Sequence, residues 1–355
     1  MNTKLKLIVL FTFAFFAFAF FTPKGETQTK VETAGQKFKN IKVLNDMPAD
    51  QMGKVMNQIS SSLGVNCAFC HTSNDGDYEK EGKKEKNDAR EMMKMTFEIN
   101  KNHFNGRPEI NCNSCHHGKN HPQAVFPMVA QKPAEERPKQ PEKKPTVEEL
   151  LAKYETALGG KAKLDKVTSR MIKAQRVEPN GTTTEPEEIW QKGGKMLSKL
   201  TYGTYVITEI YDGKDAWKLG NNAKIELQSD ETENIKRDAQ IFANPNLKTV
   251  YPKMEVRFFD KLDGKEVWII QATTADNKRD RLVFDAMTGL LVRRSSSTPT
   301  ILGNFVYQVD YQDYKDFGGV KLPTTTKVAV PNIYWTRKIL EVKNNVTVDD
   351  AKFGK

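Results

Sequence analysis

The chain has 355 residues, 38% of them hydrophobic, with a mean hydropathy of −0.63 and a formal net charge of +10 at pH 7. This length is too great for one ordinary domain and predicts about two soluble domains joined by polar segments. The basic excess is thin, with 15 basic against 13 acidic residues in 22–130 and 33 against 29 in 147–355. Such a spread excludes a nucleic-acid-binding patch, so no nucleic-acid partner is predicted.

The chain opens with a targeting segment. Lys4 and Lys6 precede an apolar run, 7–21, that is rich in Phe and Ala, as in an export signal. The run is short against the roughly 20 residues of a membrane span. Residues 1–21 are therefore predicted to be a cleaved signal peptide, with a retained anchor as the alternative, and the protein to be periplasmic. Residues 22–37 are polar and predicted to be flexible.

Residues 38–130 hold every Cys and His of the chain and predict a helical domain. Pro48 suits a first helical turn, and Gly64 can end that helix in the left-handed conformation. Between them, apolar residues recur at helical spacing: Met52, Met56, Ile59 and Leu63. The motif Cys67-Ala68-Phe69-Cys70-His71 follows directly.

A second unit repeats this arrangement. A polar loop is predicted from Thr72 to Asn87, and then a helix with Met92, Met95 and Ile99 on one face and Met93 pointing elsewhere. This helix closes with His103, Gly106 and Pro108. The motif Cys112-Asn113-Ser114-Cys115-His116 comes next, its second cysteine 45 residues after that of the first motif. Two helices with methionines, each leading to the same motif, form a loose internal repeat.

Both motifs have the form Cys-x-x-Cys-His, the attachment signature of a c-type haem. The two thiols match the two vinyl groups of one porphyrin, and the following histidine then lies under the iron. The sequence therefore predicts two covalently attached haems. They are held by Cys67, Cys70, Cys112 and Cys115, with His71 and His116 as proximal ligands.

The second axial ligand decides whether a haem carries electrons or binds small molecules. Met56 and Met52 are the candidates at the first haem, and Met92 and Met95 at the second. Spacing alone does not choose within either pair. His103 is the main rival to methionine. A methionine on an apolar helix face is usually a core residue, but each of these helices lies just upstream of a haem motif.

Residues 131–146 contain four prolines among dense charge and predict an extended linker. The second domain, 147–355, opens with the capping box Thr146-Val147-Glu148-Glu149. A helix to Leu158 follows, and Gly159-Gly160 ends it.

Beyond that helix, segments such as Tyr202 to Tyr211 and Val267 to Ala272 are rich in β-branched and aromatic residues. Turn signals recur between them, for example Asn180-Gly181 and Asp263-Gly264. This pattern predicts an antiparallel sheet of roughly eight or more strands with one or two helices, one of them near Asp230 to Phe242.

Several of these segments resemble the cytochrome subunit of photosynthetic reaction centres. They are Phe38-Lys39-Asn40-Ile41-Lys42-Val43-Leu44, Met56, Leu63-Gly64-Val65-Asn66 with the first motif, Met92-Met93-Lys94-Met95-Thr96, and Ile110-Asn111 with the second motif and His117-Gly118. The resemblance implies Met56 and Met92 as the sixth ligands. It also implies electron transfer on the outer face of the cytoplasmic membrane, with membrane-associated redox partners. That subunit has four haems and this chain two motifs, so a photosynthetic role does not follow.

The second domain is similar to periplasmic proteins of the lipoprotein-sorting type. The segments that carry this likeness are Gly303 to Pro323 and the Phe284 to Leu291 hairpin. It implies a curved antiparallel half-barrel that covers a helix and whose concave face can hold an apolar ligand such as an acyl chain.

The leading hypothesis is a periplasmic dihaem electron carrier, not an enzyme, that passes electrons from a redox protein donor to an acceptor. Its second domain would dock a partner or bind an apolar ligand. One alternative is a dihaem peroxidase-type enzyme, which needs an open iron. Another is a Cys₄ zinc module, which leaves both motif histidines unexplained. A third is a lipid or lipoprotein carrier with an appended cytochrome. The second domain has no Cys and no His, which removes most catalytic options.

Overall fold

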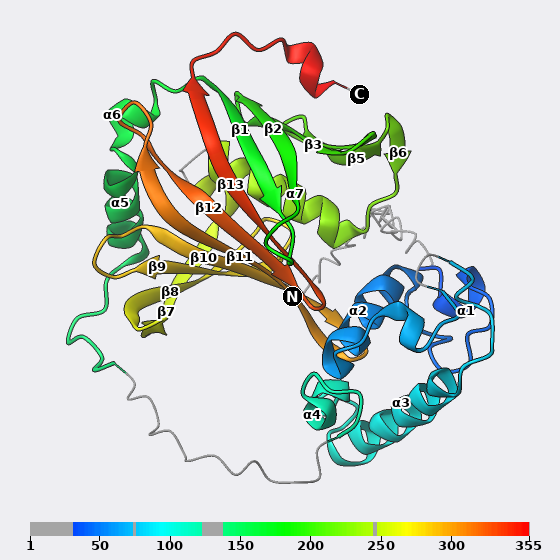
Figure 1. Cartoon of the computed structure of the whole chain (residues 1–355). Helices are drawn as coiled ribbons and strands as arrows, with labels where there is room; N and C mark the ends of the chain where they lie inside the picture. Colours follow the sequence, from blue (N-terminus) through cyan, green and yellow to red (C-terminus); the bar gives the residue numbers. More distant parts are fainter. Residues whose placement is uncertain (1–30, 74–75, 123–137, 244–246, 355) are drawn as a thin grey trace, which may run out of the picture.

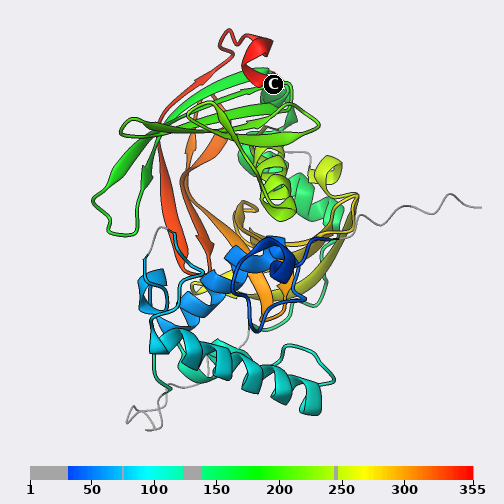
Figure 2. The same ribbon diagram turned by 90° about the vertical axis from the view of Figure 1, so that its right-hand side faces the viewer.

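The computed structural model describes residues 31–73, 76–122, 138–243 and 247–354. Within them the chain forms a helical domain (31–122) and a larger C-terminal domain built on one curved sheet (Figures 1 and 2). The predicted class, a helical domain followed by an α+β domain with a curved antiparallel sheet, is confirmed. The predicted signal peptide or anchor and residues 131–137 of the predicted linker lie outside the described residues. No described helix is both long enough and apolar enough to cross a membrane.

The helical domain is made of short elements around two longer helices. They are α1 (Ala34–Lys37), η1 (Ala49–Gln51), α2 (Met52–Leu63), η2 (Cys67–Phe69), α3 (Lys84–His103) and α4 (Cys112–His116). Helix α2 ends as predicted, because Gly64 takes the left-handed conformation at φ 66°. Its buried side chains Val55 and Ile59 join Met93 of α3 in the domain core.

Three details of the helical domain differ from the prediction. Residues 31–37, assigned to a flexible segment, are folded: Ala34 begins α1 and is fully buried. Helix α3 begins at Lys84, inside the predicted loop, because charged residues such as Lys, Glu and Arg are good helix formers. Met93 points to a different side of α3 from Met92 and Met95, as predicted, but its side is the one in the domain core: Met93 is 7% exposed, whereas Met92 and Met95 face outward.

The C-terminal domain is a thirteen-stranded antiparallel sheet. Its strands are β1 (Ser169–Val177), β2 (Thr184–Lys192), β3 (Lys195–Tyr202), β4 (Tyr205–Tyr211), β5 (Ala216–Gly220), β6 (Ala223–Ile225), β7 (Lys253–Leu262), β8 (Lys265–Thr273), β9 (Arg279–Asp285), β10 (Leu291–Thr300), β11 (Gly303–Asp316), β12 (Lys321–Val330) and β13 (Ile333–Asn344). The order runs β6 to β1 and then β13 to β7, so that β1 and β13 pair in the middle. Register shifts in the β1–β13, β9–β10 and β7–β8 pairs add to the twist that bends the sheet.

Helices accompany this sheet. They are α5 (Val147–Leu158), α6 (Lys161–Leu164), α7 (Ser229–Ala243) and α8 (Leu247–Val250), followed by η3 (Asp350–Phe353). The predicted capping box is present: the Thr146 hydroxyl accepts from the Glu149 backbone, and the Glu149 carboxylate accepts from the Thr146 backbone. Helix α7 matches the predicted one and lies against the concave side of the sheet, in contact with β3, β4 and β5 (Figure 2). The main core joins α5 to the strands through Leu150, Tyr154 and Phe284.

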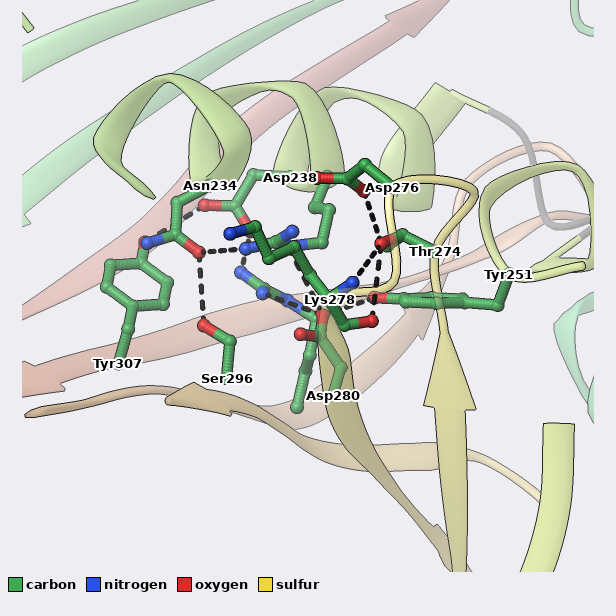
Figure 3. Close-up of polar contacts among 11 residues, drawn as sticks. Asn234, Asp238, Tyr251, Thr274, Asp276, Lys278, Asp280, Ser296 and Tyr307 are labelled. Carbon is green, nitrogen blue, oxygen red and sulfur yellow. Dashed lines mark hydrogen bonds and ion pairs between the residues drawn. The ribbon is translucent and has the colours of Figure 1, made fainter. Parts of the chain in front are cut away.

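A buried polar network joins α7 to strands β9, β10 and β11 (Figure 3). Arg294 is fully buried, and its guanidinium donates to Asp238 at 2.5 Å and to Asp280 at 3.4 Å. Tyr307 donates to the other Asp238 oxygen at 2.9 Å, and Tyr251 to Asp280 at 2.6 Å. Arg237 of α7 lies 3.2 Å from the same Asp280 oxygen. The helix is thus held to the sheet by charge as well as by apolar packing.

The turn between β10 and β11 reaches into the helical domain (Figure 1). Leu302 at its tip is 3% exposed and belongs to the same buried cluster as Val55, Ile59 and Met93. Beside it, the Thr300 hydroxyl donates to the Gln58 side chain at 2.8 Å. The core of the helical domain is therefore completed by a residue of the C-terminal domain.

Candidate haem sites

The first motif lines a large cavity, which we call the first-site cavity. It encloses about 950 Å³, at the upper end of the range for cofactor sites. Cys67, Cys70 and His71 lie on its wall together with Met52 and Met56 of α2. The structure therefore brings the predicted attachment cysteines, the proximal histidine and both candidate methionines of the first site together.

The ring of His71 is fixed by its neighbours. Its Nδ1 lies 3.1 Å from the backbone carbonyl of Tyr78, and the Tyr78 ring meets it edge-on at 5.1 Å. A carbonyl only accepts hydrogen bonds, so Nδ1 carries the proton and Nε2 keeps its lone pair for a metal. Burial lowers the pKa of His71, although the Tyr78 bond opposes this, and the charges of Lys86 and Arg90 lower it further. The neutral ring required of a ligand is thereby favoured.

The second motif is a five-residue helix, α4, that caps itself. The Asn111 side chain accepts from the Asn113 backbone at 3.0 Å, and the Ser114 hydroxyl accepts from the Asn111 backbone at 3.1 Å. The side chains of Asn111, just before the motif, and Ser114, between the cysteines, thus stabilise the turn that places both thiols. His116 Nδ1 lies 2.9 Å from the Lys119 carbonyl, so its Nε2 is also left for a metal. Burial raises the pKa of the Cys112 thiol, as it does for Cys70.

The candidate methionines of the second site lie on the outer face of α3. Met92 is 47% and Met95 45% exposed, and α3 contacts α4. The inner face of the same helix carries Met93, which lines the first-site cavity. His103 is the last residue of α3 and is exposed. Met92 and Met95 therefore share the exposed face of α3, the helix that contacts the second motif, and His103, also exposed, ends the same helix.

The two units meet backbone to backbone. The Gly118 N–H, just after the second motif, donates to the Ser62 carbonyl near the end of α2 at 2.8 Å. A Cβ placed on Gly64 would lie 2.2 Å from the Gly118 carbonyl oxygen, a distance that no side chain tolerates. Glycine at this helix end therefore allows both the left-handed conformation and the close approach of the second motif.

Several residues around the first-site cavity were not found from the sequence. Arg90 is 8% exposed and pairs with Glu81 at 2.9 Å, and Asn40 donates to the same carboxylate at 2.7 Å. These bonds, Arg90 first, lower the pKa of Glu81 to about 2. Tyr78 is the one aromatic residue in the predicted polar loop, which is the only signal that could have marked it.

The four cysteines do not come together in the described part of the chain. No group of three or more His, Cys, Asp and Glu side chains there could hold a metal ion. The donor set of each motif is instead one histidine with two thiols on its own short helical turn. That arrangement fits a porphyrin, whose own nitrogens supply four of the ligands of the iron.

A second cavity lies in the C-terminal domain, between α5, α6 and the sheet. It encloses about 300 Å³, and its wall includes Leu158, Leu164, Val320 and Leu322. Arg170 also lines it, at 6% exposure, with its Nε donating to Asn344 at 3.0 Å. Burial lowers the pKa of Arg170 to about 10. The cavity thus combines apolar side chains with three cationic ones, Arg170, Lys192 and Lys321, a surface that suits an amphipathic ligand with an anionic group.

Comparison with known proteins identifies the family. Residues 17–203, more than half of the chain, match the model of the photosynthetic reaction centre cytochrome c subunit. The chain belongs to the photosynthetic reaction centre cytochrome c subunit family. A member from Roseobacter denitrificans, the photosynthetic reaction center cytochrome c subunit, is 32% identical over 105 residues. That alignment covers 27% of this chain and 28% of the relative, so the chain spans less than a third of that cytochrome subunit.

Among solved structures, two similar ones cover more than half of this family member. A DUF1329 family protein from Desulfovibrio piger shares 14% identity at a TM-score of 0.41, over 58% of this chain and 96% of the other. A LolA superfamily protein from Nitrosomonas europaea shares 12% identity at a TM-score of 0.39, over 57% of this chain and 97% of the other.

Proposed function

We propose that the protein is an exported c-type cytochrome with two covalently attached haems, which passes electrons from a redox protein donor to a redox protein acceptor at the membrane surface. The haems supply the electron-transfer chemistry, and the chain binds, orients and shields them. In this proposal Cys67, Cys70, Cys112 and Cys115 form the thioether links. The C-terminal domain docks a partner or binds an apolar ligand.

The observation that carries the proposal is the matched orientation of the two motif histidines. His71 and His116 each direct Nδ1 at a backbone carbonyl, at 3.1 and 2.9 Å. A carbonyl partner for one ring nitrogen is the usual way in which a protein prepares the other for a metal. Surface histidines without a metal have no reason to repeat this geometry at the same place in two motifs.

The surroundings of each motif also fit a haem. The first-site cavity is walled by apolar residues, and Lys42, Lys86 and Arg90 line part of it. Their positive charges suit the carboxylates of the haem propionates. On α3, the helix that contacts the second motif, Met92 and Met95 expose apolar side chains that a flat porphyrin would cover.

The proposed sixth ligands are Met56 and Met92. A thioether on each iron would exclude water and small ligands, which suits electron transfer rather than peroxidase chemistry. Met56 is supported by its place on the wall that also carries His71. Met92 is supported by its place on the exposed face of α3, the helix that contacts α4.

The first test is the intact mass and absorption spectrum of protein matured in a periplasm. We expect the mass of the chain plus two haems, and low-spin spectra with the near-infrared band of methionine on ferric iron. Little carbon monoxide should bind to the ferrous protein. A high-spin iron with peroxide turnover would instead support the peroxidase alternative, and a colourless zinc-loaded protein would contradict both.

The axial ligands are tested by a pair of variants on α2. Met56→Leu is expected to remove about half of the near-infrared band, because one of two irons loses its thioether. Met52→Leu, on the same wall of the cavity, is the matched control and should keep the whole band. The opposite result would assign Met52 as the ligand. Met92→Leu and Met95→Leu form the same comparison at the second site.

A further inference from the structure

The first-site cavity is not enclosed by the helical domain alone. Three consecutive residues of the C-terminal domain, Glu226 to Gln228, line it together with Met52 and Met56. They form the whole connection from β6 to α7. A domain that only docked partners would have no reason to contribute to this wall, more than 150 positions along the chain from the motif it faces.

A buried ion pair lies next to this wall. Lys54 of α2 is 6% exposed, and its Nζ lies 2.7 Å from the carboxylate of Asp230, in the first turn of α7, which is 17% exposed. The same Nζ also contacts the Gln228 side chain. Lysine is rarely so buried unless it is paired, and a pair between domains fixes their relative position.

Lys54 lies midway between the two methionines of α2. Two residues correspond to about 200° around a helix. The Lys54 side chain therefore projects from the face of α2 opposite to Met52 and Met56. Lys54 therefore reaches Asp230 and Gln228 from the face of α2 that does not carry the methionines, and Gln228 extends to the cavity wall as well. Helix α7 is itself joined to the sheet through Asp238 and Arg294 (Figure 3). A continuous set of contacts thus runs from the sheet to the helix that carries Met56.

We propose that residues 226–230 of the C-terminal domain are part of the first haem site. The segment completes the wall of the site, and Lys54 and Asp230 act as positioning residues that hold α2 and balance the local charge. This inference rests on the proposed function. According to this inference, the reduction potential of one of the two haems depends on Asp230, a residue of the C-terminal domain.

The test uses redox titration of the holoprotein, in which two one-electron steps are expected. Asp230→Asn leaves the charge of Lys54 unbalanced and should raise one potential, because added positive charge favours the reduced iron. Lys54→Met leaves the charge of Asp230 unbalanced and should lower the same potential. We expect changes on the order of tenfold in the reduction equilibrium, or about 59 mV for one electron.

Two further variants separate charge from structure. The double variant Lys54→Met with Asp230→Asn should return the shifted potential toward that of the parent protein. Asp88→Asn removes one carboxylate from an exposed pair on α3 and should leave both potentials unchanged. Lys54→Arg keeps the charge and remains informative if Lys54→Met fails to fold; it should also leave both potentials unchanged.

The outcomes are distinct. Opposite shifts of one step by the two single variants support the inference. Shifts in the same direction, shifts of both steps, or no shift overturn it. If the parent protein carries fewer than two covalent haems, its mass shows this before any variant is made, and the proposed function fails with the inference.

Discussion

Replacing Arg294 with methionine is expected to lower the free energy of unfolding of the C-terminal domain by about 3–5 kcal/mol, the usual cost of leaving a buried charge without its partner. Asp238 and Asp280 both accept from Arg294. Burial alone disfavours the charged guanidinium, but Asp238 and the other acidic groups reverse this and hold the pKa of Arg294 above its ordinary value. The arginine is therefore charged when folded. Its removal takes the cationic partner from Asp238, which is 23% exposed, and leaves the fully buried Asp280 with Arg237 alone of its two arginines.

The measurement is denaturant unfolding followed by tryptophan fluorescence, because all four tryptophans lie in the C-terminal domain. Arg293→Met is the matched control. Arg293 pairs with Asp310, and the two side chains are 25% and 17% exposed. Removing this pair should therefore lower the free energy of unfolding by about 1 kcal/mol or less. Adding Asp280→Asn to Arg294→Met should recover part of the loss. Equal effects of the two arginine variants would show that the network of Figure 3 does not stabilise the domain.

Replacing Leu302 with alanine is expected to destabilise the helical domain by about 2–5 kcal/mol, as for other large-to-small changes in a core. The residue belongs to the C-terminal domain by sequence, yet its side chain is 3% exposed within the core of the helical domain. Thermal unfolding followed by haem absorbance should show the loss. Tryptophan fluorescence, which reports the other domain, should change much less.

Ile301→Ala is the control for this prediction. It removes a similar volume from the same turn, but Ile301 is 38% exposed, so its effect should be small. Two results would contradict the prediction: equal destabilisation by Leu302→Ala and Ile301→Ala, or a fall in the midpoint of the tryptophan transition as large as that of the haem transition. Either would show that Leu302 is not a core residue of the helical domain.

Local signals predicted the helix ends well. Gly64 ends α2, and Thr146 with Glu149 begins α5, because caps depend on residues within one turn of each other. The start of α3 was missed for the same reason: residues 84–87 have no strong cap, and their helical state follows from propensity and from contacts such as Arg90 with Glu81.

Of the residues proposed for the two sites, the sequence alone marks only those of the Cys-x-x-Cys-His motifs. The motif spacing marks the cysteines and histidines, but the orientation of α3 depends on which face packs on α2. The sequence offers methionines on both faces, and Met93 rather than Met92 is buried. The contact between Lys54 and Asp230 could not have been predicted, since it joins residues 176 positions apart and nothing local marks either of them.

The sheet order has a consequence for its shape. The outermost strands, β6 and β7, are consecutive in the chain although eleven strands lie between them in the sheet. Between them in the chain come α7 and α8, and α7 crosses the concave side (Figure 2). This crossing helix lies between the two edge strands in the chain. The sheet cannot flatten or widen without stretching or unfolding the segment that joins its edges, so the length of that segment limits the curvature of the sheet.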